Sequence, residues 1–300
     1  MEIEGPIDTS QAEVSGGGSR MGGRGMAVGG GGVGVVGLII YLLVNVLGGG
    51  NGGSGFNTGL GSAPTGPAVR ASQLSCPLGS AKTDIRCKMT GIVNDVQRVW
   101  ASKFAAAGKS YEPTHIVFFT GSVDTGCGGA TSQTGPFYCP ADRKVYLDTD
   151  FLTELKTRFG APGEFAQAYV VAHEFGHHIQ TLLGIEPQVR KAVQQNSSRQ
   201  SDLSVRTELQ ADCFAGVWAH DTATDVSNGQ GANVKLNPGD IEAALQAANA
   251  IGDDRLQAQA GRAVNPDTFT HGSSAQRTKW FTTGSQTGTV EGCDSFSGTP

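Results

Sequence analysis

The sequence predicts a helix-rich α+β domain with a small sheet, preceded by one transmembrane helix. Apolar residues recur at the helical period over residues 164–183 and again over 207–219. Two short runs, 115–120 and 144–148, have the apolar or alternating pattern of strands. Residues 26–47 carry no charge and end in an apolar run, which is enough for a helix to cross a bilayer.

The N-terminal part of the 300 residues differs in composition from the rest. Residues 1–25 are polar and rich in Gly and Ser, so we expect a disordered cytoplasmic leader there. Residues 48–71 are Gly-rich and predict a flexible tether. Residues 72–300 have the composition of one folded domain, whose oligomeric state has no signature in the sequence. The net charge of −5 and the lack of basic clusters argue against nucleic acid as a partner.

The charges around segment 26–47 predict its orientation in a membrane. Arg20 and Arg24 precede the segment, and the next Lys or Arg is Arg70. Cytoplasmic flanks are enriched in positive charge, so we expect a cytoplasmic N-terminus and a periplasmic or extracellular domain. A cleaved signal peptide is the alternative. We favour an uncleaved single-pass anchor because the leader before the apolar run is long.

Strands are predicted ahead of the most distinctive motif. Residues 115–120 read as a short buried strand, and residues 144–148 as a strand of alternating character. Between them, residues 127–139 read as a Gly-rich loop with a turn at Gly135-Pro136.

The helical segment 164–183 contains the pattern His173-Glu174-x-x-His177. Residues four apart share one face of a helix, so both imidazoles can bind one tetrahedral Zn²⁺. Glu174 points elsewhere and is free to take a proton from a water that the metal acidifies. The two histidines flank the apolar stripe of the helix, which predicts a site at the edge of the core.

The sequence also predicts where this helix begins and ends. Pro162 and Gly163 suit its start, and Gly184 followed by Pro187 suits its end. His178 lies about 140° from the first histidine on a helical projection, too far round to bind the same metal. We expect His178 behind a ligand or at the surface.

The second helical segment offers a third ligand. Glu208 and Asp212 lie one turn apart and share a face. We assign Glu208 to the metal and Asp212 to the ring N–H of a ligand histidine, whose orientation it would fix. The reverse assignment stays open, because either carboxylate can bind zinc. Small residues that would allow a close helix approach accompany them: Ala211, Ala215, Gly216 and Ala219.

Two further helices are predicted towards the C-terminus. Residues 237–240 open one that continues through Ala250 and serves as scaffold. Ser273 and Gln276 fit a capping box, which places His271 in the loop before another helix. A histidine in this loop can stabilise an oxyanion, so we consider His271 as a catalytic residue. A plain loop hydrogen bond is the alternative role.

All six cysteines follow the apolar run, which agrees with an oxidising compartment. Six cysteines allow fifteen pairings, and the sequence does not choose among them. A zinc site of thiolates is the rival use of these residues, but no CxxC pair is present and histidine with carboxylate completes a catalytic set. Pairs that could close loops are Cys76 with Cys87 and Cys127 with Cys139, leaving Cys213 for Cys293.

The spacing of the HExxH pattern and the ExxxD pattern after it looks like the glutamate-zincin class of metallopeptidases. Further blocks are Phe137–Pro140, Val145–Asp148, Ala172–Gln180, Glu208–Ala219, Gly239–Gln257 and Phe269–Arg277. Together these blocks resemble the bacterial putative neutral zinc metallopeptidase family, whose members carry one N-terminal membrane span. The resemblance covers the chain from about Cys76 to Cys293, and implies a zincin-like domain with zinc-dependent peptidase activity.

These observations predict a membrane-anchored zinc peptidase that acts on a peptide or protein. Zinc held by His173, His177 and Glu208 would acidify a water, and Glu174 would carry its proton to the leaving amine. We also hypothesise that residues 137–147 offer an exposed strand edge to the extended substrate, with a plain hairpin as the alternative. The competing function is a membrane-anchored binding or regulatory module in which zinc only braces the fold.

Overall fold

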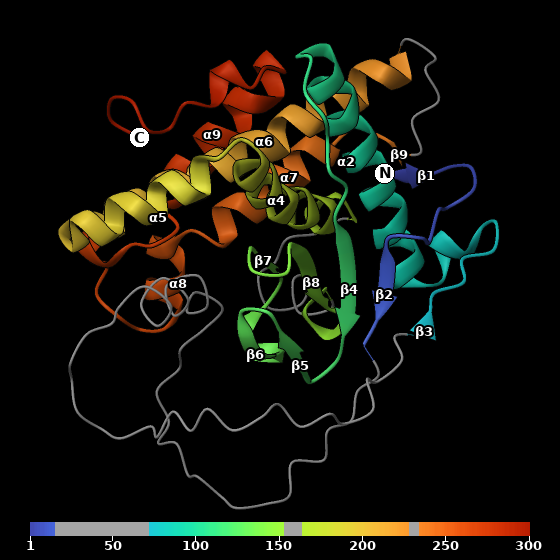
Figure 1. The fold of residues 1–300 in the computed structure, drawn as a ribbon, viewed down its shortest axis with the longest axis horizontal. Helices are drawn as coiled ribbons and strands as arrows, with labels where there is room; N and C mark the ends of the chain where they lie inside the picture. Colours follow the sequence, from blue (N-terminus) through green and yellow to red (C-terminus); the bar gives the residue numbers. More distant parts are fainter. Residues whose placement is uncertain (16–71, 153–163, 228–233) are drawn as a thin grey trace, which may run out of the picture.

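The computed structural model describes residues 1–15, 72–152, 164–227 and 234–300 (Figure 1). The predicted helix-rich α+β class is confirmed, with most helices in the upper half of the view and a five-stranded sheet below them. The strands are β1 (Glu2–Ile3), β2 (Ala12–Val14), β3 (Ser72–Gln73), β4 (His115–Phe119), β5 (Ser122–Thr125), β6 (Gly128–Thr131), β7 (Phe137–Cys139), β8 (Lys144–Asp148) and β9 (Val234–Lys235). The α-helices are α2 (Ile85–Ala106), α4 (Glu164–Leu182), α5 (Ile185–Gln195), α6 (Gln200–Ser227), α7 (Asp240–Ala250), α8 (Asp253–Gln259) and α9 (Ser274–Thr287).

The five-stranded sheet has the order β3-β2-β4-β8-β7. Strand β4 pairs in parallel with both β2 and β8, while β7 runs antiparallel to β8 at the edge. The register places His115 opposite Lys144 and Phe119 opposite Asp148. Four of the five residues of β4 and of β8 are buried, as expected for strands with a neighbour on each side. The sheet therefore presents β7 as one of its edges.

Helices α2, α4, α6 and α9 enclose one core. Phe165 of α4 stacks on Trp218 of α6, with ring centroids 5.5 Å apart. Trp100 of α2 meets Phe214 of α6 edge-on at 5.3 Å, and Phe281 of α9 is fully buried in the same cluster. Large aromatic side chains contribute most of the apolar area that holds such a core together.

The strands predicted at 115–120 and 144–148 are confirmed as β4 and β8. The predicted loop at 127–139 is correct only in part, because it contains β6, which pairs with β5, and the edge strand β7. At the predicted Gly135-Pro136 turn the chain bends at Pro136, and Gly135 has a φ of 73°, a conformation open to glycine without strain.

The helices predicted at 164–183, 207–219 and 240–250 all form, as α4, α6 and α7. Helix α4 ends at Leu182, before Gly184 with its φ of 74°. Helices α2 and α5 are not among the predicted ones. Pro187, taken as a stop signal, instead lies in the first turn of α5, where a missing N–H breaks no intrahelical bond.

The prediction of a disordered leader is wrong for residues 1–15. Strand β1 pairs with β9, and β2 lies between β3 and β4 in the main sheet. Main-chain hydrogen bonds to two neighbours and the burial of Ala12 hold this segment in the domain. The folded domain therefore includes residues 1–15, which cannot lie across a membrane from β4 while these strands are paired.

The predicted transmembrane helix at 26–47 and the tether at 48–71 lie outside the described residues, as do residues 16–25. Among the residues that the structure describes, every helix is too short or too polar to cross a membrane.

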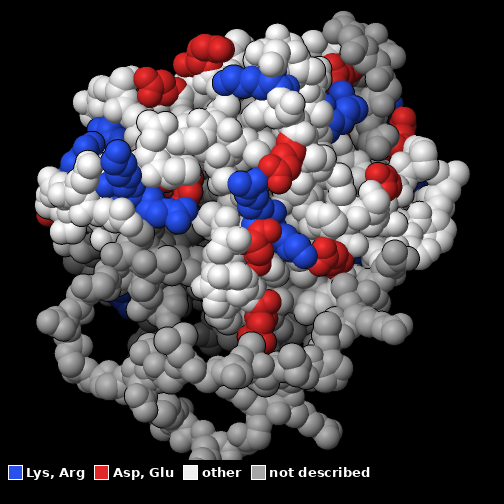
Figure 2. All heavy atoms as spheres, in the orientation of Figure 1, with Lys and Arg blue, Asp and Glu red and all other residues white. Residues whose placement is uncertain are grey.

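Charged side chains of both signs are interspersed on the face shown in Figure 2. Polar side chains of three strands meet on the sheet: Glu13 of β2 forms an ion pair with Lys144 of β8, across β4, and lies equally near Nδ1 of His115 on β4, each at 2.9 Å. Arg143 and Glu112 form another pair at 2.6 Å. Such exposed pairs contribute little to stability, but they neutralise the charge along this part of the sheet.

The six cysteines form three disulfides, each matching a pair that the sequence allowed: Cys76–Cys87, Cys127–Cys139 and Cys213–Cys293. No free thiol remains, so a site built from thiolates is excluded. The third disulfide joins α6 to the C-terminal segment, across 80 residues of sequence.

Candidate metal centre

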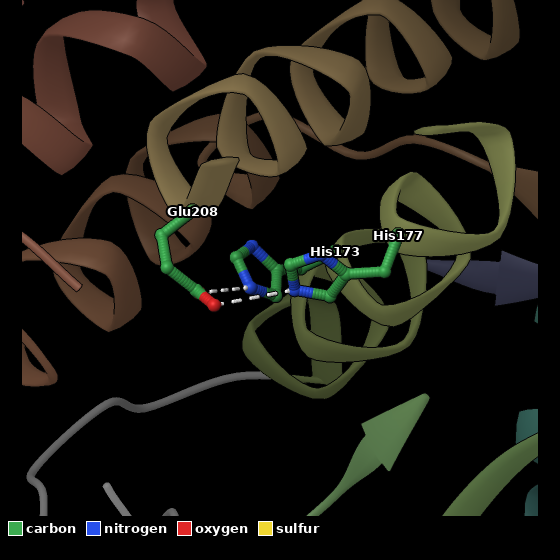
Figure 3. Close-up of side chains that lie close together, drawn as sticks. All are labelled: His173, His177 and Glu208. Carbon is green, nitrogen blue, oxygen red and sulfur yellow. Dashed lines mark hydrogen bonds and ion pairs between the residues drawn. The ribbon is translucent and has the colours of Figure 1, made fainter. Parts of the chain in front are cut away.

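Three side chains from two helices converge in the interior of the domain (Figure 3). His173 and His177 come from α4 and Glu208 from α6, and one ligand atom of each lies within 4.8 Å of the others. All three residues are less than 8% exposed. The two imidazole rings are almost perpendicular, with centroids 4.9 Å apart.

The close approach of α4 and α6 makes this convergence possible. A Cβ atom on Gly176 would lie 3.0 Å from the Cα and carbonyl oxygen of Ala211. A side chain at this position would push the two backbones a few tenths of an ångström apart, so glycine favours the close approach. Ala211 therefore faces α4 as predicted, whereas Gly216 faces α9, where its Cβ would lie 2.2 Å from the Phe281 carbonyl oxygen.

His173 is held at both ring nitrogens. Its Nδ1 lies 2.8 Å from Oδ1 of Asp212, and its Nε2 lies 3.1 Å from Oε2 of Glu208. Asp212 thus contacts the nitrogen on the far side from the converging ligand atoms. This placement fits the predicted supporting role of Asp212 and leaves Glu208 as the carboxylate in the metal position.

His177 has one nitrogen bonded and one without a partner. Its Nδ1 lies 2.9 Å from Oε1 of Gln180. Its Nε2 is buried, has no hydrogen-bond partner among the described residues, and lies 3.5 Å from Oε1 of Glu208. A buried nitrogen without a partner costs free energy, which a ligand at this position would recover.

Glu174, between the two histidines in sequence, is also buried. Its Oε2 has no hydrogen-bond partner among the described residues. The side chain is 7% exposed, so water does not fully solvate the carboxylate. Burial lowers the pKa of His177, Glu208 outweighs this effect, and the charge of Glu174 adds to the rise, so Glu174 lies close to the site.

The ionisable groups of the site indicate a surplus of negative charge. Burial lowers the pKa of His173, but Asp212 and Glu208 outweigh this effect and raise that pKa to about 10. Burial raises the pKa of Glu208, but His177, His271 and His173 outweigh it and hold that pKa well below its usual range. A site that draws protons onto imidazole in this way would equally stabilise a metal cation.

The donor set fits zinc. Two imidazole nitrogens and one carboxylate, with a fourth position left for water or substrate, form the usual protein shell of catalytic zinc. The unpartnered Nε2 of His177 is the specific observation that supports this fit. Each Nε2 points to Glu208, while each Nδ1 has its own acceptor, so both rings can present the nitrogen that a metal needs.

A buried ion pair supports Asp212, and the sequence analysis did not identify it. Arg277 of α9 donates from Nε and one Nη to the two carboxylate oxygens, each at 2.8 Å. Tyr169 of α4 donates to the same carboxylate at 2.6 Å. Burial raises the pKa of Asp212, but Arg277 and His173 outweigh it and lower that pKa to about 2. The only sequence signal was the block Phe269–Arg277, whose arginine had no assigned partner.

His271 lies in the loop before α9, as predicted, and the capping box of Ser273 with Gln276 is present. Asp253, at the start of α8, holds this loop: its Oδ2 accepts the backbone N–H groups of residues 270, 271 and 272. Its Oδ1 lies 3.4 Å from Nδ1 of His271. His271 is near enough to the centre to lower the pKa of Glu208.

His178 is buried rather than at the surface, and it lies away from the metal position. Its Nδ1 is 3.2 Å from the Tyr138 hydroxyl on β7, and its Nε2 is 2.7 Å from the Glu112 carbonyl oxygen. Burial, the largest cause, lowers the pKa of His178. The residue links the edge strand β7 to the helix that carries the HExxH motif.

Comparisons with known proteins agree with this geometry. The family described as "Putative neutral zinc metallopeptidase" matches residues 6–296. "Uncharacterized protein YpfJ" of Escherichia coli is 44% identical over 285 residues, which are 94% of this chain and 93% of that relative. "Uncharacterized protein Rv2575" of Mycobacterium tuberculosis is 47% identical over 226 residues, 74% of each chain. No solved structure matches the chain. The chain therefore belongs to the putative neutral zinc metallopeptidase family.

Proposed function

We propose that this protein is a zinc-dependent peptidase that cleaves internal peptide bonds of a peptide or protein. One observation carries the proposal: two imidazole nitrogens and the Glu208 carboxylate converge, and Glu174, near enough for its charge to act on His177, has a buried Oε2 without a partner among the described residues. A structural zinc needs four protein ligands, whereas three ligands and a nearby base are what hydrolysis requires.

Each residue then has a defined task. His173, His177 and Glu208 hold the metal, and Asp212 keeps the first imidazole in the correct orientation. Bound zinc would supply Lewis acidity, which acidifies water and polarises a carbonyl group. Glu174 accepts the proton of the attacking water and delivers it to the departing amine, so one carboxylate serves both halves of the reaction.

His271 is proposed to stabilise the oxyanion that forms at the attacked carbonyl. Its Nδ1 lies 2.9 Å from the Thr270 hydroxyl and 3.4 Å from Asp253, so Nε2 is the nitrogen left to face a substrate. The three backbone bonds to Asp253 fix the loop, and a fixed donor stabilises developing charge better than a mobile one.

Segment 137–147, predicted to form an exposed edge, is a hairpin whose second strand, β8, lies inside the sheet between β4 and β7, so β7 alone is proposed to hold the substrate. It is an edge strand of the sheet and contacts α4, which carries the HExxH motif. All three of its side chains are buried, and among the described residues its main chain pairs on one side only, with β8, which leaves the other side for a partner. Pairing of this kind binds an extended peptide without selecting its side chains.

The test is a cleavage assay on the full-length protein with a broad peptide library, with and without a chelator. Glu174→Gln should keep its zinc, and its turnover should fall about 10²–10⁴-fold, which is the usual contribution of a general base. Glu164→Gln on the same helix is the matched control, because its side chain is about half exposed and remote from the site. It should cleave at the wild-type rate.

Two results would contradict the proposal. Unaltered turnover in Glu174→Gln would remove the general base. Intact peptides in the presence of wild-type protein with one bound zinc would instead favour a non-catalytic module braced by the metal.

A further inference from the structure

We infer that Gln180 is the residue that positions His177 for zinc, and that Gln210 and the Cys213–Cys293 disulfide hold Gln180 in place. The inference depends on the metal centre of the proposed function and not on peptide cleavage.

The contacts form one continuous chain of hydrogen bonds. His177 Nδ1 lies 2.9 Å from Oε1 of Gln180, whose Nε2 donates to Oε1 of Gln210 at 3.1 Å. Nε2 of Gln210 then donates to the carbonyl oxygen of Cys293 at 2.9 Å. Gln180 also donates to the Thr207 carbonyl oxygen at 2.7 Å, in the turn of α6 that carries Glu208. Both amides are at most 5% exposed, so water does not replace these partners.

The hydrogen bonds from His177 to Cys293 all donate in one direction, and that direction suits metal binding. An imidazole that binds zinc through Nε2 carries its proton on Nδ1 and needs an acceptor there. Gln180 must then present its oxygen to His177 and its nitrogen to Gln210. Gln210 in turn presents its oxygen to Gln180 and its nitrogen to a carbonyl group, which can only accept. Every donor meets an acceptor only in this arrangement.

The last acceptor of this series of hydrogen bonds, the Cys293 carbonyl oxygen, is fixed by the disulfide. Cys293 is fully buried and bonded to Cys213, which follows Asp212 on α6. Arg206 and Ser295 tie the next residues to the same helix: Ser295 Oγ donates to the Arg206 carbonyl at 2.5 Å, and an Arg206 Nη donates to the Ser295 carbonyl at 2.8 Å. The C-terminal segment is thus a fixed support for the amide chain.

The two histidines are therefore supported in different ways. His173 has a charged support, Asp212, neutralised by Arg277. His177 has only neutral amides behind it, so its orientation depends on their exact placement rather than on attraction between charges. This difference makes His177 the ligand that loss of the disulfide should affect.

The first measurement is zinc affinity, by competition with a chromogenic chelator at a temperature well below unfolding. Gln180→Met keeps the size of the side chain and removes its hydrogen bonds, and should weaken zinc binding by about 10-fold to 100-fold. Gln210→Met should weaken it less, since it acts one bond further away. Gln188→Met, on the exposed face of α5, is the matched control and should bind as wild type does.

The second measurement separates positioning from a general loss of structure. Cobalt(II) in place of zinc gives visible absorption bands that report ligand geometry, and these bands should change in Gln180→Met but not in the control. Gln180→Glu keeps an acceptor for His177 Nδ1 but loses the donor to Thr207 and Gln210, so it should recover part of the lost affinity. A merely structural role would show neither the spectral change nor this recovery.

The role of the Cys213–Cys293 disulfide is tested by comparison with a second disulfide of the protein. Cys213→Ser with Cys293→Ser should weaken zinc binding, whereas Cys76→Ser with Cys87→Ser should leave it unchanged, because that pair lies outside the amide chain. Wild-type affinity in Gln180→Met, or equal effects of the two disulfide replacements, would overturn the inference. Zinc binding without any cleavage would defeat the proposed function and leave this inference standing.

Discussion

At the scale of single residues, two carboxylates one turn apart on α6 have different surroundings and therefore different tasks. Glu208 faces the two imidazoles, while Asp212 faces Arg277, Tyr169 and the back of His173. The guanidinium matters because a buried carboxylate shared by a tyrosine and a histidine would otherwise be costly to keep ionised. The arginine thus fixes the charge on which the orientation of the first ligand depends.

Asp212→Asn should lower the free energy of unfolding of the metal-free protein by about 3–5 kcal/mol, because it leaves the Arg277 guanidinium buried without a counter-charge. Urea unfolding at pH 7 measures this loss. Asp212→Asn combined with Arg277→Met removes both charges and should recover much of the stability. If the double variant is as unstable as the single one, the cost does not come from the unpaired charge.

The same pair predicts a dependence on pH. The pKa of Asp212, about 2 in the folded protein against an ordinary value of 3.8, is depressed. A depressed pKa contributes stability that is complete above about pH 4 and disappears as the pH falls towards about 2. Urea unfolding of metal-free protein between pH 5 and pH 2 should therefore show a steeper loss for the wild type than for the double variant.

At the scale of elements, glycines set the distances between the helices that supply the site. Gly176 brings α4 against α6, and Gly284 brings α9 against α6, where its Cβ would lie 1.9 Å from the Cys213 carbonyl oxygen. The obstacle at Gly284 is backbone, which cannot rotate away as a side chain can. The position of Arg277, about two helix turns before this contact, depends on the same crossing.

Gly284→Ala should lower the free energy of unfolding by about 3 kcal/mol and weaken zinc binding, since α9 must move and carry Arg277 away from Asp212. Chemical denaturation and the chelator competition give the two values. Gly129→Ala is the control, because its Cβ would meet only Asp124 Oδ1, at 3.6 Å. Unchanged stability in Gly284→Ala would show that the crossing is looser than the structure has it.

At the scale of the whole molecule, the N-terminal residues belong to the domain. Strand β2 separates β3 from β4, and Ile3 of β1 packs against Gly91 of α2. Without this segment β4 would become an edge of the sheet and would expose its main-chain groups. The family match begins at residue 6 and so includes β2.

Deletion of residues 1–15 should lower the free energy of unfolding by about 3–5 kcal/mol, from the apolar side chains that no longer pack. Thermal unfolding of the shortened and complete proteins measures the difference. Ile3→Ser should reproduce part of the loss, while Glu2→Ser, an exposed neighbour in the same strand, should not. A shortened protein as stable as the complete one would mean that this segment is not part of the fold.

The sequence by itself determined the elements and residues that depend on local pattern. The helices at 164–183 and 240–250, the strands at 115–120 and 144–148, and the group His173, His177 and Glu208 all follow from periodicity and from spacing along a helix. The pairing of cysteines, the Arg277 partner of Asp212, the amide chain behind His177 and the place of β2 followed only from the tertiary structure. Apart from the two local disulfides and the bond from His177 to Gln180, these contacts join residues 30 to more than 100 positions apart. No periodicity links such residues, because the packing of helices and strands alone brings them together.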